Sequence, residues 1–394
     1  MRILFANDGI GDGGGVQVYL QAVIHALRGR GHEVAFLHVD PMREGATSPA
    51  GSAAPHFCVA TGGDSAVRDA LAWKPDACFS HNMSALRVDE ALAARVPVVK
   101  MMHGYFGTCI GGEKVHKFPS MVACVRRFGI GCAALYLPRH CGSWSVGALS
   151  EQYAWARAQQ GLFARYAAVV VASEHMRREY AGNGVPEQRL TVARLFATAG
   201  GTPHAGVTPD PFRVLFVGRM TAHKGGDALV RAIAHAQDTT GVRISATFVG
   251  DGPQRADWSA LAERVGVEAE FTGWLDERSR DAQYQQAALI AVPSVWPEPF
   301  GLVGLEAGAF GVPAVAFDVG GIGEWLRDGH NGWLVPAAGG ARALGAAIAA
   351  AVAERGALQA FRLRAWQVAQ EMSRERHLDV IEHLLSQASN VEWA

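Results

Sequence analysis

The sequence predicts an α/β protein with two Rossmann-like domains. Short apolar runs typical of buried parallel strands alternate with helical patterns of about ten to fifteen residues. This alternation is interrupted by a Pro/Gly/Thr-rich segment and then resumes. The length agrees, because 394 residues are more than a single hydrophobic core usually serves.

The domain boundaries follow from the position of this interruption. We expect an N-terminal domain over 1–203, a linker over 204–211, a C-terminal domain over 212–373 and a final helical segment over 374–394. The strands expected in the first domain are 2–6, 32–39, 76–81, 96–102 and 167–173. Those expected in the second are 212–218, 244–250, 268–273, 288–294 and 313–318. Ligands of such sheets bind beyond the carboxyl ends of the strands, so the paired domains should form their site in the cleft between them.

Composition limits the function classes. Hydrophobic residues make up 49 % and charged residues 19 %, which fits a soluble α/β enzyme, and the net charge of −1 gives no general attraction to nucleic acid. The first residues form a strand without the parts of a signal peptide, and no apolar run reaches the roughly 18 to 20 residues that span a bilayer. We therefore expect a cytoplasmic protein whose six cysteines are thiols or metal ligands.

The first candidate site follows the first strand. Gly13, Gly14 and Gly15 stand directly before a helical pattern, where backbone amides and the positive end of the helix suit a phosphate. The segment lacks the GxGxxG and GK[ST] spacings of known phosphate loops. A plain tight turn explains it equally well.

Two further candidates end strands of the second domain. Arg219 and Lys224 lie five residues apart in one loop, so both cations can converge on a diphosphate; two solvated cations are the alternative. Beyond later strands, a glycine-rich slot for a nucleobase can form, although such glycines also make ordinary turns. Its residues are Gly250, Gly252, Gly273, Trp274 and Leu275.

The segment EPFGLVGLEAG, 298–308, carries two glutamates in an otherwise apolar region. Pro299 fits the first turn of a helix that ends near Gly311, which places Glu298 at the helix N-terminus and Glu306 about two turns in. Eight residues of continuous helix would separate them by roughly 12 Å along the axis. Such carboxylates cannot share one proton or one metal, but they can hold two parts of a long ligand.

These features together resemble the retaining glycosyltransferases of family 4, which have the GT-B fold. The resemblance rests on the glycine loop, on Arg219 with Lys224 and on Glu298 with Glu306, and it covers nearly the whole chain. Its most specific part is PSVWPEPFGLVGLEAGAFGVPAVAFDVGGIGEWLRDGHNGWLV. It implies two Rossmann-like domains facing across a cleft, with the C-terminal helix packing back on the N-terminal, acceptor-binding domain.

The resemblance also implies roles for single residues. Glu306 would hold the ribose of a nucleotide sugar and Glu298 the hydroxyls of the transferred sugar. Arg219 and Lys224 would neutralise the leaving diphosphate, and His103 would lie near the sugar and the reaction centre. The remaining donor contacts would come from Gly14, Gly15, Gly218, Gly250, Gly273, Trp274, Leu275, Phe300, Gly301, Leu302 and Val303.

The implied activity is transfer of a hexose from a UDP-, GDP- or ADP-sugar, with retention at the anomeric carbon. The acceptor would be a saccharide, a lipid-linked sugar or a small molecule, in polysaccharide, lipopolysaccharide or other glycoconjugate synthesis. No cofactor is expected, and because the DxD motif is absent a metal-independent reaction is favoured. A sugar-nucleotide epimerase or hydrolase of the same fold and a non-catalytic sugar-nucleotide-binding protein are the alternatives.

An insert, 103–143, concentrates cysteines and cations. A similar cysteine-bearing insert occurs in a subset of family 4. The spacing of its cysteines lacks the CxxC of common zinc sites, so a four-thiolate structural site and free, buried or oxidised thiols all stay open. These cysteines are Cys109, Cys124, Cys132 and Cys141.

The same insert supplies the expected acceptor contacts. Its cations alternate with apolar residues, which suits an anionic or lipid-linked acceptor at the inner face of a membrane. A solvated loop that covers the cleft explains the pattern equally well. The expected contacts are Tyr105, Lys114, Lys117, Arg126 and Arg127.

Overall fold

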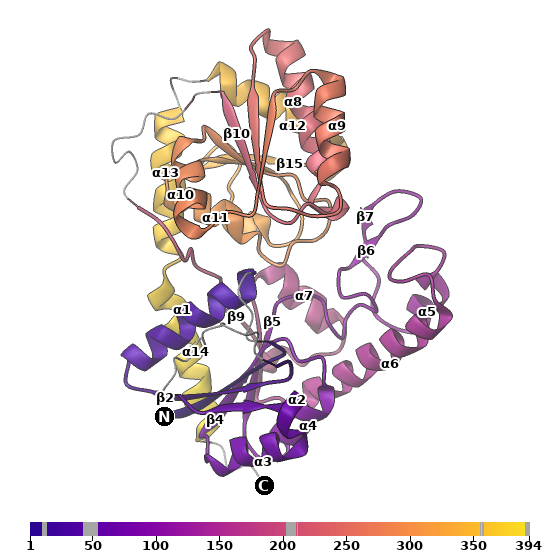
Figure 1. Ribbon diagram of the computed structural model, residues 1–394, viewed down its shortest axis with the longest axis vertical. Helices are drawn as coiled ribbons and strands as arrows, with labels where there is room; N and C mark the ends of the chain where they lie inside the picture. Colours follow the sequence, from indigo (N-terminus) through magenta and orange to yellow (C-terminus); the bar gives the residue numbers. More distant parts are fainter. Residues whose placement is uncertain are drawn as a thin grey trace. The chain divides into compact units, whose positions relative to one another are not determined.

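The computed structural model divides the chain into two compact units (Figure 1). Unit 1 consists of Met1–Phe118, Val125–Arg194 and Arg374–Ala394, and unit 2 of Pro119–Cys124 and Leu195–Ser373. The residues that the structure describes are 1–9, 14–41, 54–201, 210, 212–354, 356 and 358–390. Most of the expected linker, and Gly13 of the glycine loop, lie outside these residues.

Unit 1 is built around a seven-stranded parallel sheet. Its strands are β1 (Arg2–Asn7), β2 (Glu33–His38), β3 (His56–Cys58), β4 (Ala77–Ser80), β5 (Val98–Met102), β8 (Ala168–Val171) and β9 (Leu190–Val192). They lie in the order β3-β2-β1-β4-β5-β8-β9. The strand order therefore reverses between β1 and β4.

Unit 2 has a six-stranded parallel sheet. Its strands are β10 (Arg213–Val217), β11 (Ser245–Val249), β12 (Ala269–Gly273), β13 (Leu289–Val292), β14 (Ala314–Phe317) and β15 (Gly332–Val335). Their order is β12-β11-β10-β13-β14-β15. Here the order reverses between β10 and β13. Two further short strands are β6 (Val115–His116), in unit 1, and β7 (Val122–Ala123), in unit 2.

Helices cover both sheets. Those of unit 1 are α1 (Gly15–Gly29), α2 (Val59–Gly62), α3 (Asp64–Ala72), α4 (Leu86–Ala93), α5 (Ile130–Tyr136), α6 (Val146–Leu162), α7 (Glu174–Gly182) and α14 (Arg374–Ser389), with 3-10 turns Phe163–Arg165 and Glu187–Arg189. Those of unit 2 are α8 (Gly226–Thr240), α9 (Arg255–Val265), α10 (Glu277–Gln286), α11 (Leu302–Ala309), α12 (Gly340–Ala353) and α13 (Leu358–Glu371), with 3-10 turns Ala222–Lys224, Ile322–Glu324 and Ala337–Gly339. Within the described residues, no helix combines the length and apolar character needed to cross a bilayer.

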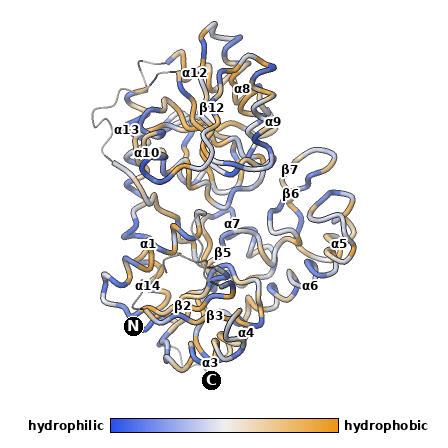
Figure 2. Tube along the Cα trace, in the orientation of Figure 1, coloured by the Kyte–Doolittle hydropathy of each residue, from blue (hydrophilic) through white to orange (hydrophobic). Residues whose placement is uncertain are grey.

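The strands form where apolar residues run without interruption, because both faces of these sheets are covered. In unit 2, α8, α9 and α12 lie on one face, and α10, α11 and α13 on the other (Figure 1). Phe216, Phe248 and Trp258 belong to the buried core beneath the first group. Figure 2 shows hydrophobic segments in orange within each unit. The ten strands expected from the sequence are all present, whereas β3, β6, β7, β9 and β15 were not expected, because runs of two to four residues give too little pattern.

The C-terminal helix α14 packs on unit 1, as the resemblance implied. His377, Leu378, Ile381 and Leu385 are buried on one face of it. On its outer side Glu382 accepts hydrogen bonds from the α1 end, and α1 and α14 lie side by side (Figure 1).

Candidate functional site

The expected site of unit 2 lies where its sheet reverses its strand order. The loop 218–225 follows β10, and the loop 293–301 follows β13. A Cβ on Gly225, whose φ is 70°, would lie 1.9 Å from the Pro293 carbonyl oxygen, so only glycine lets the two loops pack this closely. Ligands of open parallel sheets bind beyond the strand ends at such a reversal.

Lys224 and Glu298 form the centre of this group. Lys224 Nζ donates a hydrogen bond to Glu298 Oε1 at 2.6 Å, and Ser294 Oγ donates to the same oxygen at 2.5 Å. Glu298 is buried, and the Lys224 side chain is 26 % exposed, with its Nζ 5.3 Å from the ring centre of Trp296. The ammonium group is thus held between a carboxylate and an aromatic face.

This environment keeps Glu298 ionised. Burial acts to raise the pKa of the carboxyl, but the charge of Lys224 and the hydrogen bonds from Lys224 and Ser294 outweigh it and hold the pKa below its usual range. An ionised carboxylate only accepts hydrogen bonds. Glu298 is therefore suited to receive hydroxyl groups and not to donate a proton.

Glu306 has a different environment. It is the fifth residue of α11 and is buried. Tyr284 OH donates to its Oε2 at 3.2 Å and Thr198 Oγ1 donates to its Oε1 at 3.3 Å. Burial raises its pKa above the usual value, because the charge of Arg280 and these two hydroxyls offset the burial only in part. The sequence predicted neither hydroxyl partner, since both come from distant segments.

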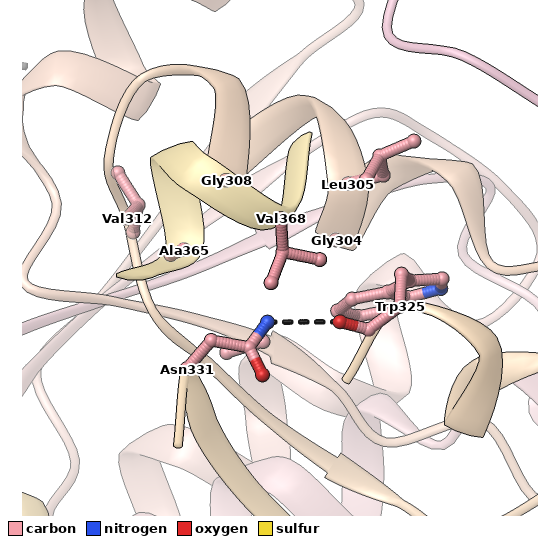
Figure 3. Close-up of a pocket in the computed structure, with 9 residues that line it drawn as sticks. Gly304, Leu305, Gly308, Val312, Trp325, Asn331, Ala365 and Val368 are labelled. Atoms are coloured by element: carbon pink, nitrogen blue, oxygen red, sulfur yellow. Dashed lines mark hydrogen bonds between the residues drawn. The ribbon is translucent and has the colours of Figure 1, made fainter. Parts of the chain in front are cut away.

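Close packing behind α11 fixes the position of Glu306. A Cβ on Gly304 would lie 2.0 Å from the Trp325 ring, and a Cβ on Gly308 would lie 3.1 Å from a backbone oxygen of α13. Figure 3 shows the space that remains here and the hydrogen bond from Asn331 Nδ2 to the Trp325 carbonyl oxygen, at 2.8 Å. Its volume of about 10 Å³ barely admits one water. This space is a packing void.

The helix α11 starts later than expected. Its N-cap is Gly301, with φ 79°, whereas Pro299 was expected in the first turn. The chain from Glu298 to the N-cap is not helical, so the separation of roughly 12 Å, which assumed continuous helix, does not apply. The Trp325 indole donates to the Phe300 carbonyl oxygen at 2.7 Å and fixes this loop.

Three expected donor contacts lie at the ends of neighbouring strands β10, β11 and β12. The Gly250 N–H donates to the Gly273 carbonyl oxygen at 2.9 Å, and a Cβ on Gly250 would lie 2.2 Å from the Gly218 carbonyl oxygen. Beside them Trp274 is 69 % exposed and Leu275 is half-buried. An exposed indole at a glycine-lined strand end can stack on a flat ligand.

The remaining expected residues of unit 2 lie in the loop after β10 and at the start of α11. Arg219 is exposed and, in the part of the chain that the structure describes, its side chain makes no hydrogen bond or ion pair. Leu302 and Val303 form the first turn of α11. Lys224 is thus hydrogen-bonded to Glu298, whereas the side chain of Arg219, in the same loop as Lys224, is exposed to solvent.

His103, expected near the reaction centre, follows β5 of unit 1 and is half-buried. Its Nε2 is hydrogen-bonded to Nδ1 of His81 at 3.0 Å, and its ring lies 5.5 Å from that of Tyr19. Burial lowers its pKa to about 3, with smaller contributions from Lys100 and His377. The imidazole is therefore neutral at pH 7 and can serve as a hydrogen-bond partner but not as a cation.

His377 of α14 is a residue whose contacts the sequence did not predict. Its Nδ1 donates to the Arg194 carbonyl oxygen at 2.9 Å, and Tyr19 OH is hydrogen-bonded to its Nε2 at 2.8 Å. Burial lowers its pKa to about 4, so the ring is neutral at pH 7. Because a carbonyl oxygen only accepts, the proton lies on Nδ1 and Tyr19 must donate to Nε2. This bond ties α14 to the last residue before the chain leaves unit 1.

The glycine loop of unit 1 leads directly into a helix. Gly14 is the N-cap of α1, with φ 120°, and Gly15 is its first residue. Both are exposed. The first N–H groups of a helix have no partner within the helix, so such a helix N-terminus suits a phosphate.

Of the five expected acceptor contacts, the structure buries two. Tyr105 is fully buried, and Lys114, 1 % exposed, forms an ion pair with Glu179 at 2.7 Å. These two side chains belong to the buried interior of the insert. The other three lie nearer the surface: Lys117, Arg126 and Arg127.

The cysteines of the insert do not form a metal site in this structure. None of the six cysteines, all of which the structure describes, is part of a disulfide. Across the described residues, no group of three or more His, Cys, Asp or Glu side chains is placed to hold a metal ion. Cys141 Sγ instead lies 3.7 Å from His116 Nδ1, and Cys109 Sγ accepts from the Lys114 N–H at 3.3 Å.

Comparison with known proteins gives two family matches that share the chain between them. The family described as Glycosyltransferase Family 4 matches residues 13–194, and Glycosyl transferases group 1 matches residues 204–367. The chain is 34 % identical to a glycogen synthase of Mycobacterium tuberculosis over 203 residues, 49 % of this chain and 47 % of the relative. It is 36 % identical to a D-inositol 3-phosphate glycosyltransferase of Streptomyces bingchenggensis over 149 residues, 35 % of this chain and 32 % of the relative.

The chain thus spans a third to a half of the length of these relatives, whereas its structural match extends over nearly the whole chain. Anabaena Alr3699/HepE in complex with UDP and glucose matches with a TM-score of 0.69 at 20 % identity, over 98 % of this chain and 100 % of that chain. At this identity the likeness concerns the fold.

Proposed function

We propose that this chain, which has the GT-B fold and matches two glycosyltransferase family models in its two halves, moves a sugar from a nucleotide-sugar donor to an acceptor hydroxyl. The observation that carries the proposal is the pairing of Lys224 with buried, ionised Glu298 at the strand-order reversal of unit 2, with Glu306 in the next helix. A cation and two carboxylates arranged on two adjacent loops and the following helix suit a ligand that has a diphosphate, a sugar and a ribose.

The proposed roles follow the chemistry of each group. Glu306 accepts the ribose hydroxyls, and Glu298 accepts hydroxyls of the transferred sugar. Arg219 and Lys224 stabilise the charge that develops on the leaving diphosphate, which preorganised cations do most effectively in a site that excludes water. Backbone groups of 300–303, together with Gly14 and Gly15, complete the phosphate and sugar contacts, and neutral His103 binds a sugar hydroxyl. The base lies against Gly218, Gly250, Gly273, Trp274 and Leu275.

We further propose a hexosyl transfer that retains the anomeric configuration and needs no metal. Retention is a property of the family that the sequence resembles. Metal independence is supported by the absence of a DxD motif and by the presence of Arg219 and Lys224, which supply the positive charge themselves. NMR analysis of the product anomer tests the first statement, and assays with and without EDTA test the second.

The donor proposed for the first test is a UDP-sugar, because HepE was solved with UDP and glucose. The acceptor class is a saccharide, a lipid-linked sugar or a small molecule in glycoconjugate synthesis. Two relatives differ here, since one is named a glycogen synthase and the other acts on D-inositol 3-phosphate. Thermal-shift screening of UDP-, GDP- and ADP-sugars identifies the donor, because a ligand at 100 times its Kd stabilises by about 2.7 kcal/mol.

We also propose that the protein is cytoplasmic and contacts the inner face of a membrane. Arg126 and Arg127 are exposed in the insert. This stretch of the sequence also carries well-exposed large hydrophobic side chains, the type that enters the interface of a bilayer. They are Phe118, Val122, Val125, Ile130, Trp144 and Val146.

One experiment separates the proposed activity from its alternatives. Purified protein is incubated with the donor found by thermal shift and a panel of acceptors, and the products are separated by mass. A new glycoside that depends on both Glu298 and Arg219 supports transfer. Release of free or epimerised sugar without any glycoside indicates a hydrolase or epimerase, and donor binding without turnover indicates a binding protein.

A further inference from the structure

We propose that a pocket in unit 1, enclosed by the loops after β1 and β4, binds a neutral polyol or sugar as the acceptor. The acceptor assignment rests on the proposed function, whereas the binding itself does not. The pocket has a volume of about 80 Å³, several times the roughly 10–15 Å³ that one water needs. Its lining residues include Asp8, His81, Ser84, Lys100, Phe106 and Trp155.

The position of the pocket is that of a ligand site. Asp8 directly follows β1, and His81 directly follows β4. The sheet of unit 1 reverses its strand order between these two strands. The Asp8 N–H donates to the Asn82 carbonyl oxygen at 2.7 Å, so the two loops are joined across the reversal. Open parallel sheets bind ligands at this place.

The apolar wall is formed by two aromatic rings held in fixed positions. Trp155 of α6 and Phe106 pack edge to face, with ring centres 5.9 Å apart. The Trp155 indole donates to the Ser84 carbonyl oxygen at 2.7 Å, which fixes the orientation of its ring. A few polar groups beside a rigid apolar wall are the usual composition of a small-molecule site. The C–H face of a sugar or cyclic polyol fits such a wall.

The polar wall offers a carboxylate oxygen. Asp8 Oδ1 accepts from the Ser84 N–H at 2.7 Å and from Ser84 Oγ at 3.0 Å. Among the described residues, Asp8 Oδ2 takes part in no hydrogen bond. Because one oxygen is anchored and the other is not, Asp8 is positioned to accept a hydroxyl donor of a ligand.

The charges of the pocket select a neutral ligand. Lys100 lies beneath it, but its Nζ pairs with the buried carboxylate of Asp89 at 2.5 Å and also donates to Ser80 Oγ at 3.1 Å. The cation is therefore neutralised, and the carboxylate of Asp8 gives the pocket a net negative character. An anion would meet repulsion here, whereas a hydroxyl-bearing molecule would find an acceptor.

His81 connects the pocket to the proposed reaction centre. Its ring is fully buried, and in the described part of the chain its Nε2 has no hydrogen-bond partner. Leaving such a group unpaired costs about 1–3 kcal/mol, which a ligand hydroxyl can recover. The Nδ1 of the same ring is bonded to His103. The imidazole of His81 thus links a hydroxyl bound in the pocket to His103, the residue proposed to contact the donor sugar.

Saturation-transfer NMR with a neutral panel of myo-inositol, glycerol and methyl α-glucopyranoside tests the proposal, with inorganic phosphate and an inositol phosphate as anionic probes. The expected result is saturable binding of at least one neutral probe that phosphate does not displace. Asp8→Asn should weaken this binding at least tenfold. Asp40→Asn changes a nearby exposed carboxylate that does not line the pocket and should alter binding less than twofold.

Trp155→Phe provides a second variant, in case Asp8→Asn does not fold, and should weaken binding several-fold. The proposal is overturned if no neutral probe binds, if the anionic probes bind more tightly, or if neither variant differs from the wild type. UDP binding is measured on the same samples by thermal shift. Loss of polyol binding with UDP binding intact contradicts only the pocket, whereas absence of any nucleotide binding contradicts the proposed function.

Discussion

Lys224 and Glu298 lie 2.6 Å apart, from Nζ to Oε1, across the strand-order reversal of unit 2. The lysine is proposed to bind diphosphate and the glutamate to bind the sugar. Without a ligand, each residue satisfies the charge of the other. A molecule that carries both a phosphate and a sugar offers a partner to each, whereas a phosphate alone leaves the buried carboxylate with one partner fewer.

This difference in role predicts that the two glutamates respond differently to substitution. Glu306→Ala should weaken nucleotide binding generally, because the ribose loses its acceptor. Glu298→Ala should lower kcat more than nucleotide affinity, because the sugar and the leaving-group lysine lose their position. Isothermal titration with UDP, combined with kcat and KM for the UDP-sugar, measures both. Equal loss of nucleotide binding in the two variants would refute the division.

The pH dependence of Glu298 has a definite sign. Its folded pKa lies below the usual value near 4.5, so its ionisation stabilises the fold above that pH, and this contribution is lost as the pH falls through the lowered pKa. Glu298→Gln should therefore reduce the free energy of unfolding at pH 7, by about 1–3 kcal/mol. Urea unfolding at pH 7 and pH 3 measures the effect, which should shrink at the lower pH. An unchanged difference at both values contradicts the assignment.

Glu306 should show the opposite sign. Its folded pKa is raised, so the wild type loses stability as the pH rises from about 4.5 through that value. Glu306→Gln should increase the free energy of unfolding at pH 7 by about 1 kcal/mol and raise Tm by about 2–4 °C, while it weakens UDP binding. Near pH 4 the stability gain should vanish. A variant that is less stable than the wild type at both pH values would show that the carboxylate supports the fold.

The sequence predicted local features of the fold but not contacts between distant segments. Apolar runs predicted the strands, because that signal is local. The loops that carry Arg219, Lys224 and Glu298 follow predicted strands, whereas the role of these residues in binding stays a prediction. The partners of Glu306 could not be predicted, since Tyr284 and Thr198 meet it only after folding. The surface role expected for Lys114 failed for a similar reason, because its acidic partner is 65 positions away, at Glu179.

The packing of α11 predicts the effect of one methyl group. Gly304→Ala would place a Cβ 2.0 Å from the Trp325 ring, and such overpacking costs about 1–3 kcal/mol. Because Glu306 is on the same helix, UDP binding should weaken as well. Gly161→Ala in α6 is the matched control, since a Cβ there meets nothing within 4 Å. This control should be neutral or stabilising by up to about 1 kcal/mol. Equal effects of the two variants on unfolding would contradict the packing argument.

The histidines of unit 1 predict a spectroscopic result. Burial lowers the pKa of His103 to about 3 and that of His377 to about 4, so both rings should remain neutral from pH 5 to pH 8. In 15N NMR spectra His377 should show the tautomer protonated at Nδ1, which its bond to the Arg194 carbonyl requires. His103→Gln and His377→Gln assign the signals. Titration of either ring near pH 6.5 would exclude the neutral roles given to them.

The exposed apolar residues of the insert predict binding to anionic membranes. Ile130, in the insert with Arg126 and Arg127, is 80 % exposed, and Trp144, directly after the insert, is 72 % exposed. Interfacial helices and loops bind through such apolar groups, while nearby cations add roughly 1 kcal/mol each with anionic lipid. Co-sedimentation with vesicles of phosphatidylglycerol should therefore exceed that with phosphatidylcholine and fall with salt. Combining Trp144→Ala with Ile130→Asp should reduce it at least fivefold, whereas Leu363→Ala, which removes an exposed leucine of α13, should not. If both variants sediment like the wild type, the insert is a solvated loop.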